Sequence, residues 1–466
     1  MRFCIKGRFL CVVFFLVLFA FGCGEAKRAP LDVSVYFTCD TRGRLVPCGC
    51  FTGQFGGLTR LKTVLDAEAP ASAIRLDVGD AIGGKEDYHL IEYEYLLRAY
   101  ASMKFDLLNL GQREAELPAA RLREFKTNSP VPLISANLLD KATGAPIFER
   151  YRILRRGPYR IAVVGVMDPR GLSDNLGDGL AVEKMESTLS RLLPELRRQA
   201  DLIILLAFTD EATLTKLAQE FYEVDVILGG KVSQPAQKLE KENRSLISFV
   251  TNESRALGAL RLRLSGRSRV ASLSHEIRLL HDRIPQDEAI QPLAAAYREQ
   301  IRAAKLAVDS PERLQENMVP GVRTVATFVG TEACIECHRS AVQAWQKSGH
   351  AHAFRTLREN KADADPKCIG CHTIGFASPS GYRREFAGSK MTDVGCESCH
   401  GPGSLHLKQY RGDASVSFKF RPLGAGDCQK CHYGEFSRPF DWDQFWPVIR
   451  HGKEPKPAGL VQPPRI

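Results

Sequence analysis

The sequence CIECH at Cys334–His338 is the first of four copies of one pattern, Cys-x-x-Cys-His. The other copies are CIGCH at Cys368–His372, CESCH at Cys396–His400 and CQKCH at Cys428–His432. Two cysteines three residues apart share one helical turn, so both thiols can bond to the vinyl groups of a haem while the adjoining histidine binds its iron. The pattern predicts four covalently bound c-type haems, and four irons in one chain indicate electron transfer.

A Cys-x-x-Cys pair can also form a disulfide or one half of a zinc site. Zinc binding gives no reason for a histidine directly after the second cysteine in all four copies, so we favour haem. The attachment residues are then Cys334, Cys337, Cys368, Cys371, Cys396, Cys399, Cys428 and Cys431, and the proximal iron ligands are His338, His372, His400 and His432.

The same region holds four further histidines, His350, His352, His406 and His451, but only one methionine, Met391. We expect the histidines to supply distal iron ligands. A single methionine can ligate one iron at most, so most irons should have two histidines and low reduction potentials. On a helix His350 and His352 would point about 200 degrees apart, so they could serve two different haems but not the same one.

The chain of 466 residues is too long for one ordinary hydrophobic core, and we expect two domains joined by a connector. Its 44% hydrophobic and 25% charged residues are typical of a soluble globular protein. The formal net charge is +10, but no basic run is interleaved with aromatic residues, so no nucleic-acid partner is predicted. The expected segments are a leader at 1–22, an α/β domain at 31–282, a helical connector at 283–325, a haem domain at 326–452 and a tail at 453–466.

Residues 1–22 have a basic start followed by the apolar run Phe9–Phe21, which predicts a secretory signal peptide too short for a permanent membrane span. Ala20 and Gly22 before Cys23 resemble a bacterial lipoprotein cleavage box, which would leave Cys23 lipid-modified. The alternative is plain cleavage and release. We therefore expect a protein of the periplasm or outer cell envelope, anchored to a membrane and serving redox partner proteins that the sequence does not name.

Residues 31–282 alternate apolar strand runs with helical stretches, which indicates an α/β domain with buried strands. Strands are expected at 33–37, 74–78, 107–110, 133–138, 161–166, 202–207 and 224–228, and helices near 88–103, 185–199 and 211–222. Three later runs, 246–250, 257–264 and 270–280, are expected to close the domain as an antiparallel edge. In the connector, Ile290, Tyr297 and Ile301 share one helical face.

From about Gly330 onward the chain resembles the cytochrome c-554 family of tetrahaem proteins. The resemblance rests on TEACIECH, AWQKSGHAHAF at Ala344–Phe354, VGCESCHGPGSLH at Val394–His406, and the second and fourth motifs. It implies a mostly α-helical and irregular tetrahaem cytochrome c domain, with closely packed haems that pass electrons between partners. His350 and His406 match distal-ligand positions of the family, and His451 and His352 are the further candidates.

Residues 31–260 resemble the metallophosphoesterases of the 5'-nucleotidase and UDP-sugar hydrolase group. The shared stretches include YFTCDTRGRL at Tyr36–Leu45, GGLTRL at Gly56–Leu61, RLDVGD at Arg75–Asp80 and NLGQRE at Asn109–Glu114. The resemblance implies a four-layer α/β sandwich with a two-metal site at the carboxyl ends of its strands.

The ligand positions of that group are only partly kept in this chain. Asp40 and Asp80 are kept, and with Gln112 and Asp210 they make up a residual phosphoesterase site. Gln112, Asp210, Arg42, Arg113, Lys231 and Ser233 stand where the family has histidines or other ligand and catalytic residues. Two-metal hydrolysis needs both ions clamped with a water activated between them. Positive side chains would instead disfavour cations and favour an anion, so we expect ordinary nucleotidase activity to be lost, with a bound divalent metal as the alternative.

Three cysteines of the α/β domain, Cys39, Cys48 and Cys50, lie outside the haem motifs. A Cys-x-Cys pair close to a third thiol could bind a soft metal or cycle between thiol and disulfide. A structural disulfide in an oxidising compartment is the alternative.

Three functional hypotheses follow. The first is an exported tetrahaem electron carrier whose α/β domain docks a partner or an anion. The second is an oxidoreductase that reduces a small substrate at a haem with an open axial position or at the Cys48 and Cys50 thiols. The third is a metal-dependent phosphoesterase tethered to a cytochrome, which the missing histidines argue against.

Overall fold

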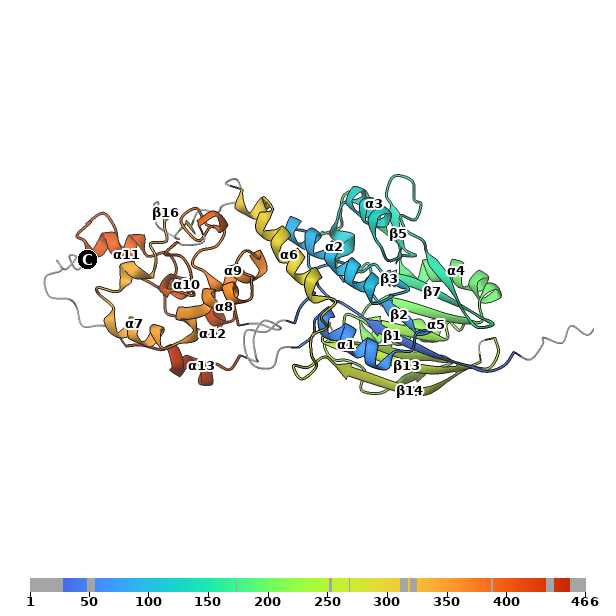
Figure 1. The fold of residues 1–466 in the computed structure, drawn as a ribbon. Coiled ribbons are helices and arrows are strands. Elements are labelled where there is room, and N and C mark those ends of the chain that lie inside the picture. Colours follow the sequence, from blue (N-terminus) through green and yellow to red (C-terminus); the bar gives the residue numbers. More distant parts are fainter. Residues whose placement is uncertain are drawn as a thin grey trace, which may run out of the picture.

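The computed structural model describes residues 28–47, 55–172, 174–250, 254–267, 269–310, 317–318, 325–386, 389–432 and 440–452. They form a large α/β lobe and a smaller helical lobe, with helix α6 (Gln291–Ala303) lying between them (Figure 1). The predicted leader, Cys23, Cys48, Cys50 and the tail lie outside these residues. Within them, no helix combines the length and the apolar character that crossing a membrane requires.

The first sheet of the α/β lobe has six strands in the order β14-β13-β1-β2-β3-β4. They are β1 (Leu31–Thr38), β2 (Ile74–Asp77), β3 (Leu107–Asn109), β4 (Leu133–Ile134), β13 (Ala256–Leu264) and β14 (Val270–Leu279). Strands β1 to β4 are parallel, and β13 and β14 add an antiparallel edge. The parallel strands all end at one side of the sheet, where the residual site lies.

The second sheet has the order β11-β12-β10-β9-β7-β6. Its strands are β6 (Tyr151–Arg156), β7 (Tyr159–Met167), β9 (Leu202–Phe208), β10 (Val226–Gly230), β11 (Glu240–Glu242) and β12 (Ser245–Phe249). The prediction that 246–250 belongs to the antiparallel edge was wrong, because β12 pairs in parallel with β10 in this sheet. All five residues of β12 are buried, as suits an interior strand covered on both faces.

The predicted strand at 133–138 is two strands in the structure. β4 ends at Ile134, and β5 (Leu138–Asp140) pairs separately with β8 (Leu180–Val182). The sequence prediction also missed two helices, α1 (Leu58–Glu68) and α3 (Ala119–Asn128).

The two sheets face each other between outer layers of helices, which confirms the predicted four-layer sandwich. Along β9, Ile203 and Leu205 pack with α4 (Met185–Gln199) and α5 (Glu211–Glu220), whereas Ile204 and Leu206 join the core shared with the first sheet. This alternation follows from the two-residue period of a strand. Helices α1, α3 and α2 (Asp87–Ser102) contribute to the core of the first sheet.

The helical lobe contains short helices and little apolar core. Its helices are α7 (Arg339–Gln346), α8 (Ala353–Glu359), α9 (Pro366–His372), α10 (Cys396–His400), α11 (Ser404–Tyr410), α12 (Ala425–Cys428) and α13 (Trp442–Ile449). Three short 3-10 turns lie within this lobe: η4 (Thr331–Cys334), η5 (Gly349–His352) and η6 (Arg384–Phe386). Two others precede it, η1 (Glu114–Glu116) and η2 (Ala307–Asp309). A two-stranded sheet is formed by β15 (Asn317–Met318) and β16 (Val325–Ala326). Its buried apolar cluster is small and includes Phe354, Ile369, Tyr382 and Met391. Covalent haems would supply the remaining core of such a domain.

A buried carboxylate links the ends of the first two parallel strands. Asp77 accepts hydrogen bonds from Thr38 Oγ1 at 2.6 Å, Tyr100 Oη at 2.9 Å and the Gly79 amide at 2.9 Å. Burial raises the pKa of Asp77 to about 7, although these hydrogen bonds act in the opposite direction.

We predict that Asp77 makes stability depend on pH. Its folded-state pKa lies above the unfolded value, so its stabilising contribution is complete below the unfolded pKa and is lost as pH rises through about 7. Denaturant unfolding between pH 5 and 8 should show Asp77→Asn losing less stability with rising pH than the unmodified chain, by about 1 kcal/mol per pH unit. Asp66→Asn, at a side chain that is 53% exposed, is the control and should keep the original slope; equal slopes for all three proteins would contradict the assignment.

Candidate haem sites and the residual phosphoesterase site

Each Cys-x-x-Cys-His motif forms a helical turn. The second motif lies in α9 and the third is α10 itself. In the first and fourth motifs the histidine amide donates a helical hydrogen bond to the carbonyl of the first cysteine, His338 to Cys334 at 3.0 Å and His432 to Cys428 at 2.8 Å. Both thiols and the imidazole of a motif are thereby held on one turn, the arrangement that covalent haem attachment needs.

Three pairs of histidines face each other at one common distance. The ring centres of His338 and His406, of His350 and His432, and of His400 and His451 are each 6.0 Å apart. In every pair one member belongs to a haem motif and the other is one of the distal candidates.

This distance fits an iron between the two rings. A metal–imidazole bond is about 2 Å long, and the ring centre lies roughly 1 Å beyond the ligating nitrogen, so two rings on opposite faces of one iron have centres roughly 6 Å apart. The residues present therefore suit bis-histidine haem, and the pairing assigns His406 to the first motif, His451 to the third and His350 to the fourth.

The surroundings of four imidazoles favour the neutral form, which is the form that binds iron. Burial lowers the pKa values of His350, His372, His400 and His406, and neighbouring imidazoles lower those of His350, His400 and His406 further. For His400 the lowering neighbours are His451 and His338.

His372 of the second motif is oriented by the backbone. Its Nδ1 donates to the Ala353 carbonyl at 2.7 Å, which fixes the tautomer with Nε2 available for iron. The cationic form of His350 is disfavoured by both His432 and His372, so these three imidazoles form one cluster. His352, the remaining distal candidate, is exposed and lies outside the three pairs.

Several cysteines lie close to a cysteine of another motif, including Cys399 of the third motif and Cys428 of the fourth. The Cys334 and Cys396 thiols share a hydrogen bond, which lowers the pKa of Cys396 to about 7, and the Cys371 and Cys431 thiols are joined in the same way. The first motif therefore lies against the third, and the second against the fourth. Haems attached to these sulfurs would be close neighbours.

The residual phosphoesterase site lies where the parallel strands end. Asp40 follows β1, Asp80 follows β2 and Gln112 follows β3, while Asp210 and Lys231 follow β9 and β10 of the second sheet. The backbone is left-handed at four residues in three of these turns, with φ of 51° at Asp40, 49° at Arg42, 56° at Asp80 and 61° at Lys231. Strained conformations of non-glycine residues gather at functional sites, so the strand ends have the backbone character of such a site.

Arginines bind the carboxylates at these strand ends. Arg42 binds Asp40 with both a 2.7 Å Nε–Oδ1 and a 2.8 Å Nη2–Oδ2 hydrogen bond. Asp80 accepts a hydrogen bond from the Arg113 amide at 2.9 Å, and the Arg113 Nε lies 3.6 Å from its other oxygen.

A third arginine, Arg170, was not identified from the sequence. It binds Asp168 after β7, and its Nη2 donates to Asp210 at 2.6 Å. These bonds help to lower the pKa values of Asp168 and Asp210 against the effect of burial. Asp168 and Asp210 are far apart in the sequence, but they follow the neighbouring strands β7 and β9. The fold therefore brings Asp210 to Asp168 and Arg170.

The other predicted residues of this domain differ in their surroundings. Gln112 donates its amide to the carbonyls of Asp168 and Arg170, and Lys231 and Ser233 are exposed. Cys39 is 1% exposed and packs against Gly230, and burial raises its pKa well above the usual value. A buried thiol of this kind is not a thiolate at neutral pH.

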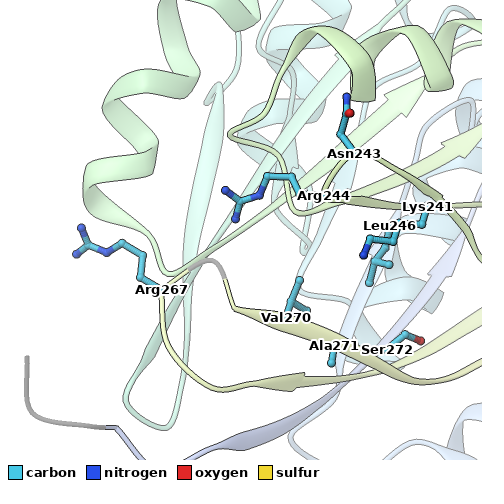
Figure 2. A pocket seen from close by; sticks show the side chains of 8 residues that line it. All are labelled: Lys241, Asn243, Arg244, Leu246, Arg267, Val270, Ala271 and Ser272. Atoms are coloured by element: carbon cyan, nitrogen blue, oxygen red, sulfur yellow. The ribbon is translucent and has the colours of Figure 1, made fainter.

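A surface pocket of about 760 Å³ lies elsewhere in the domain, between β11–β12 of one sheet and β14 of the other (Figure 2). It is lined by Lys241, Asn243, Arg244, Leu246, Arg267, Val270, Ala271 and Ser272. Arg244 binds Asp225 at 2.8 Å, and Arg267 Nε is 4.0 Å from Asp201. The pocket shares no residue with the strand-end site, and carboxylates offset its charge.

We predict that His406→Ala, His350→Ala and His451→Ala each convert one iron from low to high spin. The covalent attachment should persist, because the thioether bonds do not involve the distal ligand. Electron paramagnetic resonance and absorption spectra of the purified variants test this, and His352→Ala is the matched control that should leave the low-spin count unchanged. Fully low-spin spectra for His406→Ala and His350→Ala would show that the distal ligands are assigned wrongly.

Comparisons with known proteins find similar proteins for both the C-terminal and the N-terminal part of the chain. Residues 333–401 match the family model described as cytochrome c554 and c-prime. Cytochrome c-554 of Nitrosomonas europaea is 39% identical over 103 residues, which are 19% of this chain and 42% of that protein.

The N-terminal half matches nucleotidases. The 5'-nucleotidase of Vibrio cholerae is 30% identical over 142 residues, 29% of this chain and 25% of that protein. The 5'-nucleotidase precursor of Thermus thermophilus superposes with a TM-score of 0.51 at 18% identity, covering 71% of this chain and 68% of that one. The chain thus spans less than half of either curated relative. These matches identify it as a C-terminal cytochrome c-554-related domain joined to an N-terminal domain with the 5'-nucleotidase, metallophosphoesterase-like fold.

Proposed function

We propose that this protein is an exported tetrahaem c-type cytochrome that transfers electrons between redox partner proteins. The observation that carries the proposal is the set of three imidazole pairs with ring centres 6.0 Å apart, each joining a haem motif to a distal histidine. The four motifs and the cytochrome c554 family match support the same conclusion.

The residues of the chain would hold and insulate the cofactors. A bound c-type haem gains and loses one electron at its iron. The paired imidazoles would hold the iron of a bound haem from both sides and would leave small molecules little access to it. The attachment cysteines of the first and third motifs are close neighbours, as are those of the second and fourth, so the haems they would carry should lie close together.

The location of the protein in the cell is part of the same proposal. The basic start, the apolar run Phe9–Phe21 and Cys23 favour export followed by lipid attachment, and covalent haem attachment suits an exported protein. Radiolabelled fatty acid should be incorporated into the unmodified chain and not into Cys23→Ser.

A second candidate is the reduction of a small substrate at a haem iron that would keep an open axial position. The observation that favours it is the exposure of His352, the distal candidate that lies outside the three imidazole pairs. A high-spin signal in the unmodified protein that shifts with added nitrite, hydroxylamine or nitric oxide would favour this function. A wholly low-spin protein that is inert to these ligands would favour a pure carrier.

We also propose that the α/β domain is not a two-metal hydrolase. The strand-end carboxylates Asp40, Asp168 and Asp210 bind guanidinium groups in the positions where a phosphoesterase would hold cations. A cation pair would have to displace these arginines, and their charge would oppose it. The donor set therefore does not fit the divalent-metal alternative.

We predict four covalent haems per chain. Intact mass and haem absorbance of the purified protein should report four additions, and Cys399→Ala should leave three firmly bound. Zinc in the protein without haem absorbance would end the proposal.

We predict that the full chain does not release phosphate from AMP or from a UDP-sugar at ordinary enzyme rates. Turnover should stay below about 1 per second with Mg²⁺, Mn²⁺ or Zn²⁺ added. The matched control is Asp40→Asn, which removes a remaining ligand: any residual rate that it leaves unchanged is not catalysis at this site. Metal-dependent turnover at or above this rate that Asp40→Asn abolishes would restore the hydrolase hypothesis.

A further inference from the structure

The second haem motif lies at the joint between the two lobes. Asp365, the N-cap of α9, accepts a 2.9 Å hydrogen bond from the Tyr297 hydroxyl of α6. Arg302 of α6 donates to Asp363 at 2.6 Å, and Arg384 donates to Asp309 at 2.6 Å. Because Tyr297, Asp365 and Arg384 are all largely buried, this joint is a fixed packing contact rather than a loose tether.

A buried ion pair stands at the centre of the joint. Lys367 of α9 donates to Glu92 Oε1 of α2, and the two side chains are 16% and 2% exposed. The Lys367 ammonium also lies 5.7 Å from the centre of the Tyr297 ring. Burial disfavours both charges, yet Glu92 raises the pKa of Lys367 and Lys367 lowers that of Glu92, so both stay ionised.

Lys367 directly precedes Cys368, the first haem-attachment residue of the second motif. Burial raises the pKa of Tyr297, and the charges of Asp365 and Glu92 raise it further. Cys368 also lies close enough to Tyr297 to act in the same direction, with a smaller effect. The ion pair is therefore a near neighbour of the second attachment site.

On its other side Glu92 contacts the loop that follows β1. A Cβ added to Gly43 would lie 2.1 Å from Glu92 Oε2, so only glycine allows the carboxylate this approach. His89 Nδ1 lies 3.8 Å from Glu92 Oε2. The same loop carries Asp40 and Arg42, so one carboxylate separates Lys367 from the residual phosphoesterase site.

We propose that Lys367 and Glu92 are positioning residues that set the reduction potential of the haem held by the second motif and tie that haem to the α/β domain. The inference rests on the proposed function, since it needs haem at Cys368 and Cys371. Reduction adds one negative charge to a haem, and charges in a water-poor joint interact strongly with it. A buried ammonium raises the potential of such a haem, and a buried carboxylate lowers it.

The two charges should act with opposite signs. Lys367→Met leaves the carboxylate alone and should lower the midpoint of one haem. Glu92→Gln leaves the ammonium alone and should raise the midpoint of the same haem, while Lys367→Met combined with Glu92→Gln should restore it most of the way. Packing damage has no reason to produce opposite shifts that cancel.

Spectroelectrochemical titration of the full chain tests the proposal. Lys367→Arg keeps the charge and should keep the midpoint. Lys430→Met is the matched control, because Lys430 is also a lysine beside haem-attachment cysteines, in the fourth motif, but its side chain is 68% exposed and water screens its charge. In a Cys368→Ala/Cys371→Ala background the shifts should disappear, which assigns them to the second motif.

Any of three results would overturn the proposal. The midpoints could be unchanged in both single variants, the two shifts could have the same sign, or the shifts could persist without the second haem. Intact mass of every variant separates this failure from a failure of the proposed function. Four haems without the opposite shifts overturn only the role of the ion pair, whereas a chain without covalent haem overturns both.

Discussion

One iron can bind two imidazoles only when their rings are held on opposite faces about 6 Å apart, and the helical lobe is built to meet this constraint. His338 is the N-cap that precedes α7 and His406 lies in α11, yet their ring centres are 6.0 Å apart. The same spacing joins His400 to His451 across the span from α10 to the end of the described chain. The apolar cluster is small because most of the interior is arranged around these pairs.

The α/β lobe has the metallophosphoesterase-like fold, and the carboxylates at the ends of its strands bind arginines. In a sandwich of this kind the backbone at the carboxyl ends converges whatever side chains it carries, and the left-handed turns at Asp40 and Asp80 belong to that backbone. In this chain Asp40, Asp168 and Asp210 bind guanidinium groups of arginines at those strand ends. Fold and activity are therefore separable here, because the strands determine the position of the site and a few side chains determine its chemistry.

The joint between the lobes connects the second haem motif to the loop of the residual phosphoesterase site. A buried ion pair is costly to form and gives little net stability, so its value lies in fixing one arrangement. Lys367 and Glu92 fix α9, with its haem motif, against α2 and the loop after β1. One carboxylate of the α/β domain, Glu92, therefore lies beside the second Cys-x-x-Cys-His motif.

The sequence by itself determined the features that depend on neighbouring residues. A Cys-x-x-Cys-His motif closes one helical turn, so attachment cysteines and proximal histidines are predictable from spacing, and strand periodicity together with the family resemblance gave the four-layer sandwich. The tertiary structure alone decided which distal histidine faces which motif, that β12 joins the second sheet, and that Arg170 links Asp168 to Asp210. These contacts join residues far apart in the chain, and so does the pairing of Lys367 with Glu92. No local pattern encodes such pairings, because they arise only when separate elements pack together.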